Sequence, residues 1–395
     1  MFFLAISQNI LLFFSALGTL QGVLLALILY FHPKSDRTVN LFLGLYIFWI
    51  SIPSITLIVQ YLFSWHIIIF VQPFLLLIGP LLYLYIRSFK EAITWRKTWP
   101  HLILFFLFLI AAYWLYSDIG PKYPRSENVP KELPRHPVYY SLIIIRSIQR
   151  LVYYFLARNM LISYQRSIQQ LYSETSRINL HWVKWLVNGY LLLVLLIISF
   201  NVFILIYPEQ YSLLVLIIGV LVTIYVYMAA VKGIFQPTLW QVNVNLNKEQ
   251  VEAEIKQAEQ VELKRPANKK PIASETKIDE IISKLNSVMK NEKLYQEAEL
   301  TLQQLAEKIK SPSYQVSQAI NERMGKNFYD LVNGYRVEEA KRLLADSENK
   351  NYTILSVGFE AGFNSKTTFN TVFKKFTGLT PTEYRDKQQQ TLVIE

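Results

Sequence analysis

Apolar residues dominate the first 235 positions, in runs separated by short polar segments. Seven of these runs have about the length that a helix needs to cross a bilayer, roughly 20 residues. They are 10–31, 41–62, 67–86, 102–116, 138–157, 185–207 and 212–231. The pattern predicts a seven-helix transmembrane bundle over residues 1–235. Because the fourth run is short and the fifth is amphipathic, counts of five or six spans stay open.

The hydrophobic pattern changes at residue 236. Residues 236–274 are polar, with only a weak helical period, and predict a linker. Apolar residues then recur at helical spacing from Ile278 through Ile281 and Leu285, which predicts the first helix of an all-α domain. We assign this domain to residues 275–387 and a short tail to residues 388–395.

An internal repeat occupies the C-terminal domain. Each copy has a Thr before its first helix, a small residue inside that helix, and a Gly after its second helix. These residues are Thr301, Ala306 and Gly325 in the first copy and Thr353, Gly358 and Gly378 in the second. A small side chain lets two short helices cross closely, and Gly suits the left-handed residue that ends a helix. The repeat predicts two helix-turn-helix motifs.

Capping residues mark further helix ends in the repeat. Ser311 and Ser365 place a hydroxyl just before each second helix, where it is expected to accept a backbone N–H bond. Thr380 and Glu383 have the spacing of a capping box, with Pro381 as the first helical residue.

The motifs of this domain resemble a known family. Gly362-Phe363-Asn364-Ser365, together with Phe369, Phe373, Gly378 and Pro381, closely resembles the signature of AraC/XylS-type transcriptional regulators. The run from Ser317 to Glu322, with Gly325 and Tyr335-Arg336, is similar to the family's first motif and connecting helix. The resemblance covers about the last hundred residues and implies a bipartite DNA-binding domain that binds double-stranded promoter DNA.

The second helix of each copy is expected to enter the major groove. Its outward residues by helical period are Tyr314, Gln315, Ser317, Gln318 and Asn321 in the first copy and Lys366, Thr367, Thr368, Asn370 and Thr371 in the second. The resemblance implies phosphate contacts from Lys374, Lys375 and Arg385. Gln318 and Thr371 stand where Arg is common in the family, so we expect adenine to be favoured through Gln318. The alternative is that these residues form an ordinary solvated helix surface.

Charge is distributed unevenly along the chain. Of 40 Lys and Arg and 29 Asp and Glu, residues 1–240 contain 17 and 7, whereas residues 275–387 contain 17 and 16. Lys and Arg accumulate on the cytoplasmic side of membrane proteins. Alternate loops in the apolar half carry them, apart from the segment 117–137. The pattern predicts a multi-pass protein of the cell (inner) membrane, with the N-terminus outside and the C-terminal domain in the cytoplasm.

Two arginines lie within the fifth apolar run. Arg146 and Arg150 are four residues apart and share a helix face with Gln149. Charges at such a depth are costly, and no predicted span contains an Asp or Glu to neutralise them. Either they bond to carbonyls, Tyr hydroxyls and Asn201 of the chain, or they hold an anionic ligand or lipid headgroup.

The composition narrows the function. With no Cys and five scattered His, thiol catalysis, zinc fingers and a His-based metal site are not expected, and we expect neither a cofactor nor an enzyme. The sequence predicts a membrane-bound transcription regulator that senses a small or lipid-like signal through its bundle. Membrane lipid, RNA polymerase and a second copy of the chain are further candidate partners. The alternative is a membrane receptor or adaptor whose helical domain binds a protein.

Overall fold

The chain is almost entirely helical. The computed structural model describes residues 2–31, 37–55, 66–122, 133, 136–175, 181–207, 211–234, 275–346 and 352–394. Within these residues there is no strand, only an isolated bridge between Tyr172 and Thr301. The all-α class is confirmed for this part of the chain. The predicted linker, residues 236–274, lies outside the described residues.

The chain forms two compact units. The N-terminal unit comprises Met1–Ser163 and Leu180–Asn245, and the C-terminal unit comprises Tyr164–Asn179 and Leu246–Glu395. One helix, α8, spans Pro137–Leu171 and therefore contributes to both units. The predicted boundary at residue 235 did not anticipate that residues 164–179 would group with the C-terminal domain.

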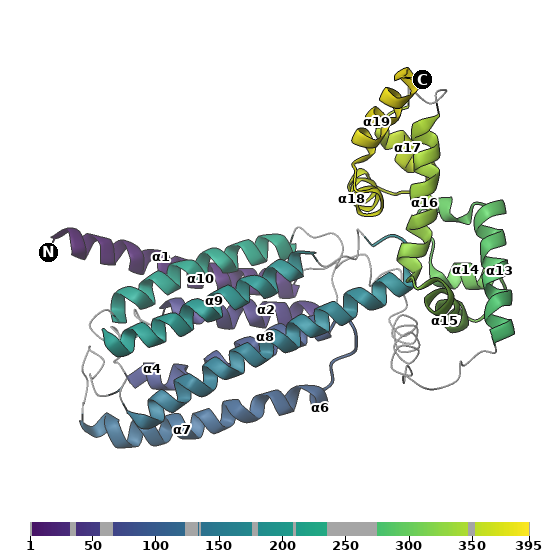
Figure 1. Ribbon diagram of the computed structural model, residues 1–395. Helices are drawn as coiled ribbons and strands as arrows, with labels where there is room; N and C mark the ends of the chain where they lie inside the picture. Colours follow the sequence, from purple (N-terminus) through teal and green to yellow (C-terminus); the bar gives the residue numbers. More distant parts are fainter. Residues whose placement is uncertain are drawn as a thin grey trace. The chain divides into compact units, whose positions relative to one another are not determined.

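The N-terminal unit is a bundle in which the long helices lie side by side (Figure 1). Its elements are α1 (Phe2–Phe31), α2 (Arg37–Ser51), η1 (Ile52–Ile55), α4 (His66–Val71), η2 (Phe74–Leu76), α5 (Ile78–Arg87), α6 (Trp95–Thr98), η3 (Trp99–Leu102), α7 (Ile103–Ile119), η4 (Gly120–Lys122), most of α8, α9 (His181–Ile206) and α10 (Tyr211–Ile234). Helix covers at least part of every predicted span. Residues 56–62 of the second span lie outside the described residues.

Three helical stretches in the described residues are long and apolar enough to cross a membrane, by length and composition. They are Ile69–Arg87, Trp95–Lys122 and Trp182–Ile204. Shorter apolar helices occur at Ala16–Phe31, Thr38–Ser51 and Ile217–Gly233. A bundle of seven spans therefore stays a prediction.

The third apolar run is interrupted by a short 3₁₀ segment. The Gly79-Pro80 pair predicts a kink at that place, but the interruption comes earlier, between Val71 and Ile78. Pro80 lies in the first turn of α5, where a backbone N–H has no partner within the helix, so the missing donor is tolerated. The carbonyl of Leu76, in the interrupted stretch, accepts a bond of 2.9 Å from Nε2 of Gln149.

Two glycines of α1 mark close helix contacts. A Cβ atom on Gly18 would overlap the side chain of Thr223 in α10, and one on Gly22 would lie 2.5 Å from Cβ of Ser51 in α2. Gly18 and Gly22 thus bring α1 against two helices of the same chain, as expected for a G-x-x-x-G pair.

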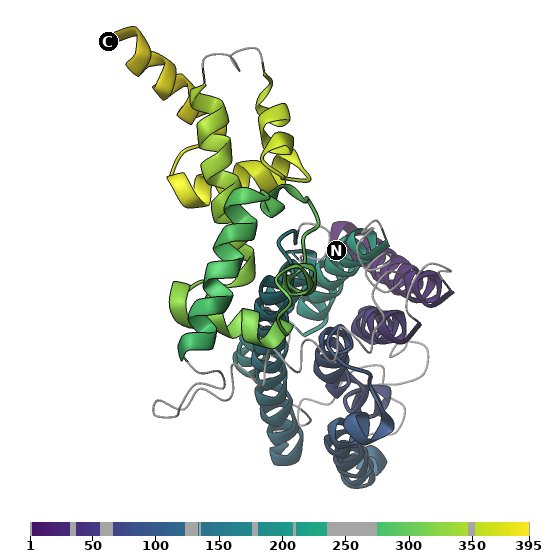
Figure 2. The same ribbon diagram turned by 90° about the vertical axis from the view of Figure 1, so that its right-hand side faces the viewer.

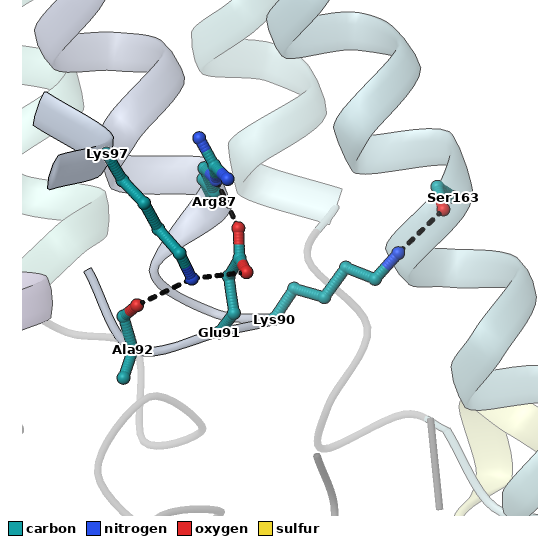
Figure 3. A network of polar contacts seen from close by, with 6 residues as sticks. All are labelled: Arg87, Lys90, Glu91, Ala92, Lys97 and Ser163. Atoms are coloured by element: carbon teal, nitrogen blue, oxygen red, sulfur yellow. Dashed lines mark hydrogen bonds and ion pairs between the residues drawn. The ribbon is translucent and has the colours of Figure 1, made fainter. Parts of the chain in front are cut away.

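Ion pairs fix the connection between α5 and α6 (Figure 3). Glu91 pairs with Arg87 and with Nζ of Lys97, the latter at 2.6 Å. Lys97 also donates to the carbonyl of Ala92 at 3.1 Å. Lys90 of the same connection donates to Oγ of Ser163 in α8 at 3.3 Å. This cluster neutralises part of the positive charge of the loop.

The C-terminal unit is built around α16 (Phe328–Ala345), which runs between two groups of helices (Figures 1 and 2). One group contains α13 (Glu275–Asn291), η7 (Leu294–Gln296), α14 (Leu302–Lys308) and α15 (Ser313–Met324). The other contains α17 (Ile354–Glu360), α18 (Lys366–Thr377) and α19 (Pro381–Ile394). Phe328 and Val332 of α16 join the core of the first group, and Val337 and Leu344 join that of the second. A single helix therefore links two separate cores.

Candidate nucleic-acid interface

The first helix pair, α14 and α15, starts with a complete capping box. The N–H of Thr301 donates to Oε1 of Gln304 at 2.8 Å, and the N–H of Gln304 donates to Oγ1 of Thr301 at 3.2 Å. The small residue Ala306 is buried at 2% exposure. Gly325 ends α15 with a left-handed φ of 62°, as predicted.

One cap of this pair differs from the expectation. Ser311 does not cap α15; its hydroxyl donates to the carbonyl of Ile309 at 3.4 Å. The N-cap residue is Pro312, which offers no side-chain bond. Because α15 begins after Pro312, Ser311 lies one residue before the cap position, and its hydroxyl bonds to the preceding turn instead.

The second helix pair, α17 and α18, follows the predicted pattern more closely. Ser365 caps α18 by accepting the N–H of Thr368 at 3.1 Å. Gly378 ends α18 with φ of 79°. A Cβ atom on Gly358 would lie 2.7 Å from Cδ1 of Phe369, so only glycine lets α17 and α18 approach this closely. The predicted capping box of α19 is also present, since Thr380 and Glu383 exchange bonds of 2.7 and 3.3 Å.

The outward face of α18 contains most of the predicted contacts of the second copy. Lys366, Thr367 and Thr371 are exposed, and Asn370 is half-buried. Thr368, predicted to face outward, is 8% exposed. It lies in the first turn of α18, where its Oγ1 accepts from Oγ of Ser365 at 2.9 Å. Thr368 therefore belongs to the cap and not to the open surface.

The first copy departs further from the expectation. Tyr314 and Asn321 are partly exposed, but Gln315, Ser317 and Gln318 are only 8, 6 and 4% exposed. All residues from Gln315 to Ile320 are buried. The helical period predicts a solvated face, and this face is not exposed at Gln315, Ser317 and Gln318. Contact of these residues with DNA stays a prediction.

Both glutamines of α15 keep hydrogen-bonding capacity. Nε2 of Gln318 donates to Glu322 at 3.0 Å, and Nε2 of Gln315 donates to the Tyr314 hydroxyl at 3.0 Å. The Oε1 atoms of Gln315 and Gln318 have no hydrogen-bond partner among the described residues. An unmatched buried amide oxygen is costly, so these two atoms favour an additional donor.

The predicted phosphate contacts have different surroundings. Lys374 is exposed on α18. Lys375 pairs with Asp330 at 2.7 Å, and Nη1 of Arg385 donates to the carbonyl of Tyr352 at 3.0 Å. Lys375, although exposed, and Arg385 thus bind within the domain. Among the described residues, Lys366 and Lys374 are the exposed lysines of α18 without an ion pair.

A segment that the sequence did not indicate joins this domain from the N-terminal half of the chain. We call residues 171–175, which end α8 and follow it, the strap. Both the N–H and the hydroxyl of Ser173 donate to the carbonyl of Leu300, at 3.2 and 2.6 Å. The hydroxyl of Thr368 donates to Glu174 at 3.4 Å. The strap therefore contacts the residue before the first helix pair, Leu300, and the first turn of α18.

Arg336 of α16 holds the strap. Its side chain is fully buried and donates to the carbonyls of Tyr295 at 2.8 Å and Glu297 at 2.7 Å, and to Oγ of Ser173 at 3.2 Å. Asn333, one turn earlier, donates to the carbonyl of Ser173 at 3.0 Å. Burial lowers the pKa of Arg336 to about 10, so the guanidinium stays protonated at neutral pH. No sequence signal marks the partnership because the partners lie 163 positions apart.

The arginines of the fifth apolar run are brought together in the N-terminal unit. Arg146 and Arg150 are 6 and 4% exposed and line one cavity with Asn201. Gln149 is not among the lining residues, since its amide bonds to Leu76. The expected pair is therefore present, whereas Gln149 faces the interrupted third run.

Comparisons with known proteins concern the C-terminal part of the chain. Residues 305–387 match the family described as "Helix-turn-helix domain". An uncharacterized HTH-type transcriptional regulator of Staphylococcus aureus (strain COL) is 31% identical over 102 residues, which cover 26% of this chain and 13% of the relative. Its counterpart in strain MSSA476 is also 31% identical over 102 residues, with the same coverage.

The matched segment spans only 13% of the length of those relatives. No solved structure matches the chain. The family match begins in α14 and ends in α19, so it spans both helix pairs and α16. The C-terminal part of this chain is thus an AraC-type helix-turn-helix domain, homologous to those of HTH-type transcriptional regulators.

Proposed function

We propose that this chain is a membrane-bound, sequence-specific transcription regulator. Its two helix pairs are two helix-turn-helix motifs, and its N-terminal bundle is the sensor. The DNA-binding part of the proposal rests on two matching helices, α15 and α18. Each has 12 residues and ends at a left-handed glycine, and the two pack on opposite ends of α16.

The dimensions of α16 support simultaneous binding of both motifs. Its 18 residues extend about 27 Å at 1.5 Å per residue. Successive major-groove segments on one face of B-DNA lie roughly 34 Å apart. Helices that pack on a spacer of this length can enter adjacent segments of the groove. We therefore expect a binding site of two segments about one helical turn apart.

The membrane location is supported by the three apolar helical stretches and by the loop charges. We propose a multi-pass protein with the N-terminus outside and the C-terminal domain in the cytoplasm. The 35 residues of α8 extend about 52 Å, longer than the roughly 30 Å hydrocarbon core, so one end of α8 has to project into water. An enzyme that is active only in the cytoplasm, fused after Glu395, tests this topology.

DNA binding is best tested with the full-length chain in nanodiscs. Selection from random duplexes should yield sites with two conserved segments. Binding should weaken steeply with salt, because Lys366 and Lys374 would neutralise phosphates. Lys366→Ala and Lys374→Ala should each lower affinity and reduce the salt slope, whereas Lys290→Ala on α13, also exposed, should change neither. Protection of a single segment in a footprint would contradict the two-motif proposal.

One observation favours a second function, a membrane receptor or adaptor whose helical domain binds a protein. Residues 275–387 are nearly neutral, and Phe359 and Tyr352 are 53 and 45% exposed. Exposed aromatic side chains are typical of protein interfaces. If the full-length chain selects no duplex at low salt, the adaptor function is favoured.

A further inference from the structure

A cavity of about 150 Å³ lies within the N-terminal unit. Residues of α2, the interrupted third run, α8, α9 and α10 line it. This volume is on the order of that filled by a single six-membered ring, and is much larger than a water molecule needs. The cavity is thus large enough for the headgroup of a small ligand.

The polar groups of the cavity are arranged for an anion. Arg146 and Arg150 both line it, and no Asp or Glu is among the described residues that do so. Nη1 of Arg150 has no hydrogen-bond partner in the described part of the chain, although its residue is 4% exposed. Nδ2 of Asn201 and the hydroxyl of Tyr190, which also line the cavity, likewise have no hydrogen-bond partner among the described residues. These three groups can all donate hydrogen bonds.

The burial of two guanidinium groups favours an occupant with negative charge. Two guanidinium groups four residues apart on one helix repel each other, and each loses hydration on burial. A carboxylate or phosphate placed between them would restore both losses through charge-assisted hydrogen bonds. Water alone could accept a hydrogen bond from Nη1 of Arg150 but would bring no negative charge to it.

The remainder of the cavity is apolar. Leu193, Phe200 and Val222 are among the side chains that line it. These residues give a hydrocarbon chain a surface on which to pack, whereas a small inorganic anion would leave that surface without a partner.

We propose that this cavity binds the carboxylate or phosphate headgroup of an anionic amphiphile, held by Arg146 and Arg150, and that the apolar chain of the ligand extends from the cavity along α9 and α10. Arg146 and Arg150 belong to α8, whose last residues are part of the C-terminal unit, so the ligand would bind to a helix that both units share. This inference rests on the proposed sensor function and names the chemical class of its signal. The headgroup comes either from a membrane lipid or from a free amphiphile.

The test measures binding to the purified full-length chain, without DNA, in phosphatidylcholine nanodiscs. Thermal unfolding is followed through Trp fluorescence during titration with decyl phosphate, decanoate, decanol, decyltrimethylammonium and inorganic phosphate. Decyl phosphate or decanoate should raise the melting temperature by several degrees, and decanol and decyltrimethylammonium should not. A response to inorganic phosphate equal to that of decyl phosphate would overturn the amphiphile assignment.

Variants locate the site. Arg146→Gln and Arg150→Gln should each weaken binding of decyl phosphate at least about tenfold, whereas Arg158→Gln, on the exposed surface of α8, should retain it. If a cavity variant does not fold, the unmodified chain still tests the proposal, because decyl phosphate should stabilise it and decanol should not. Equal stabilisation by decanol and decyl phosphate, or equal loss in Arg158→Gln, would overturn the proposal.

The source of the headgroup is distinguished in the same assay. If a lipid occupies the cavity, nanodiscs that contain phosphatidylglycerol should raise the melting temperature and abolish the further effect of decyl phosphate. If the ligand is a free amphiphile, decyl phosphate should stabilise the chain equally in both kinds of nanodisc. Because no DNA is present, a negative result would leave DNA binding unaffected.

Discussion

Gly358 and Gly334 are both helical glycines of the C-terminal unit, but their surroundings differ. The nearest neighbour to an added Cβ is 2.7 Å away at Gly358 and 3.6 Å away at Gly334. The first distance is a clash and the second is ordinary contact. Gly358 is therefore required by packing, whereas Gly334 only lowers the helix propensity of α16.

This difference gives a matched pair of substitutions. Gly358→Ala should destabilise the second helix pair by about 1–3 kcal/mol, because the methyl group must displace the buried ring of Phe369. Gly334→Ala should be neutral or stabilising by up to about 1 kcal/mol. Hydrogen exchange of the amides in α17 and α18, measured on the full chain, would show the effect. Equal exchange in both variants would contradict this account.

Arg336 allows a second prediction at the residue scale. Arg336→Met should destabilise the C-terminal unit by about 3 kcal/mol or more, because buried carbonyls of Tyr295 and Glu297 would lose their donors. Arg342→Met is the control. The exposed side chain of Arg342 pairs with the buried carboxylate of Glu339 at 3.0 Å, and Glu339 keeps Lys293 as a second partner. Loss of Arg342 should therefore cost less than about 1 kcal/mol. The measurement is the exchange of amides in α16.

At the scale of elements, two serines that the sequence predicts to be helix caps behave differently: Ser365 caps α18, whereas Ser311 does not cap α15. Ser365→Ala should cost about 1 kcal/mol and speed exchange in the first turn of α18, because a cap bond of 3.1 Å is lost. Ser311→Ala should cost less than about 0.5 kcal/mol, because Ser311 caps no helix. If the two variants were equally destabilised, the assignment of Pro312 as the N-cap would be wrong.

Local features of the repeat could be predicted because their causes lie within a few residues. The glycines that end α15 and α18, the capping box of Thr380 and the cap of Ser365 all depend on neighbours at most four positions away. Ser311 was misassigned because Pro312 fits either the N-cap or the first helical position, and the hydroxyl alone does not decide between them. The kink at Gly79-Pro80 was misplaced for a similar reason, since proline is tolerated in a first turn.

Features formed by distant segments could not be predicted. The burial of Gln318 depends on what covers α15, and the helical period contains no such information. The partners of Arg336 lie in the strap and in the turn before α14, and hydrogen bonds between such segments leave no periodic pattern. The Arg146 and Arg150 pair is intermediate: the sequence placed both on one helix face, but it could not show that they line a cavity.

At the scale of the whole molecule, the strap is expected to retain the C-terminal domain without a covalent link. If a protease site is inserted between residues 245 and 246, the cleaved C-terminal fragment should stay bound to the nanodisc-embedded N-terminal fragment, because Ser173 remains hydrogen-bonded to Arg336 and Asn333. Asn333→Leu should speed release of the fragment. The control is Asn291→Ala, on the exposed end of α13.

The outcome is read by sedimentation of the nanodiscs after cleavage. Immediate release of the unmodified fragment would show that the strap contacts are too weak to hold the domain. Faster release in Asn333→Leu but not in Asn291→Ala would locate the retention at the strap.

The strap also limits how such a protein can be recombined. A chimera joined within residues 236–274 would combine Ser173 and Glu174 of one parent with α16 and α18 of another. The residue at the position of Arg336 would then face a strap from a different protein. Functional exchange of the DNA-binding module would require residues 171–175 to be transplanted with it. Compatibility between such modules thus depends on five residues that lie about a hundred positions upstream of the DNA-binding domain.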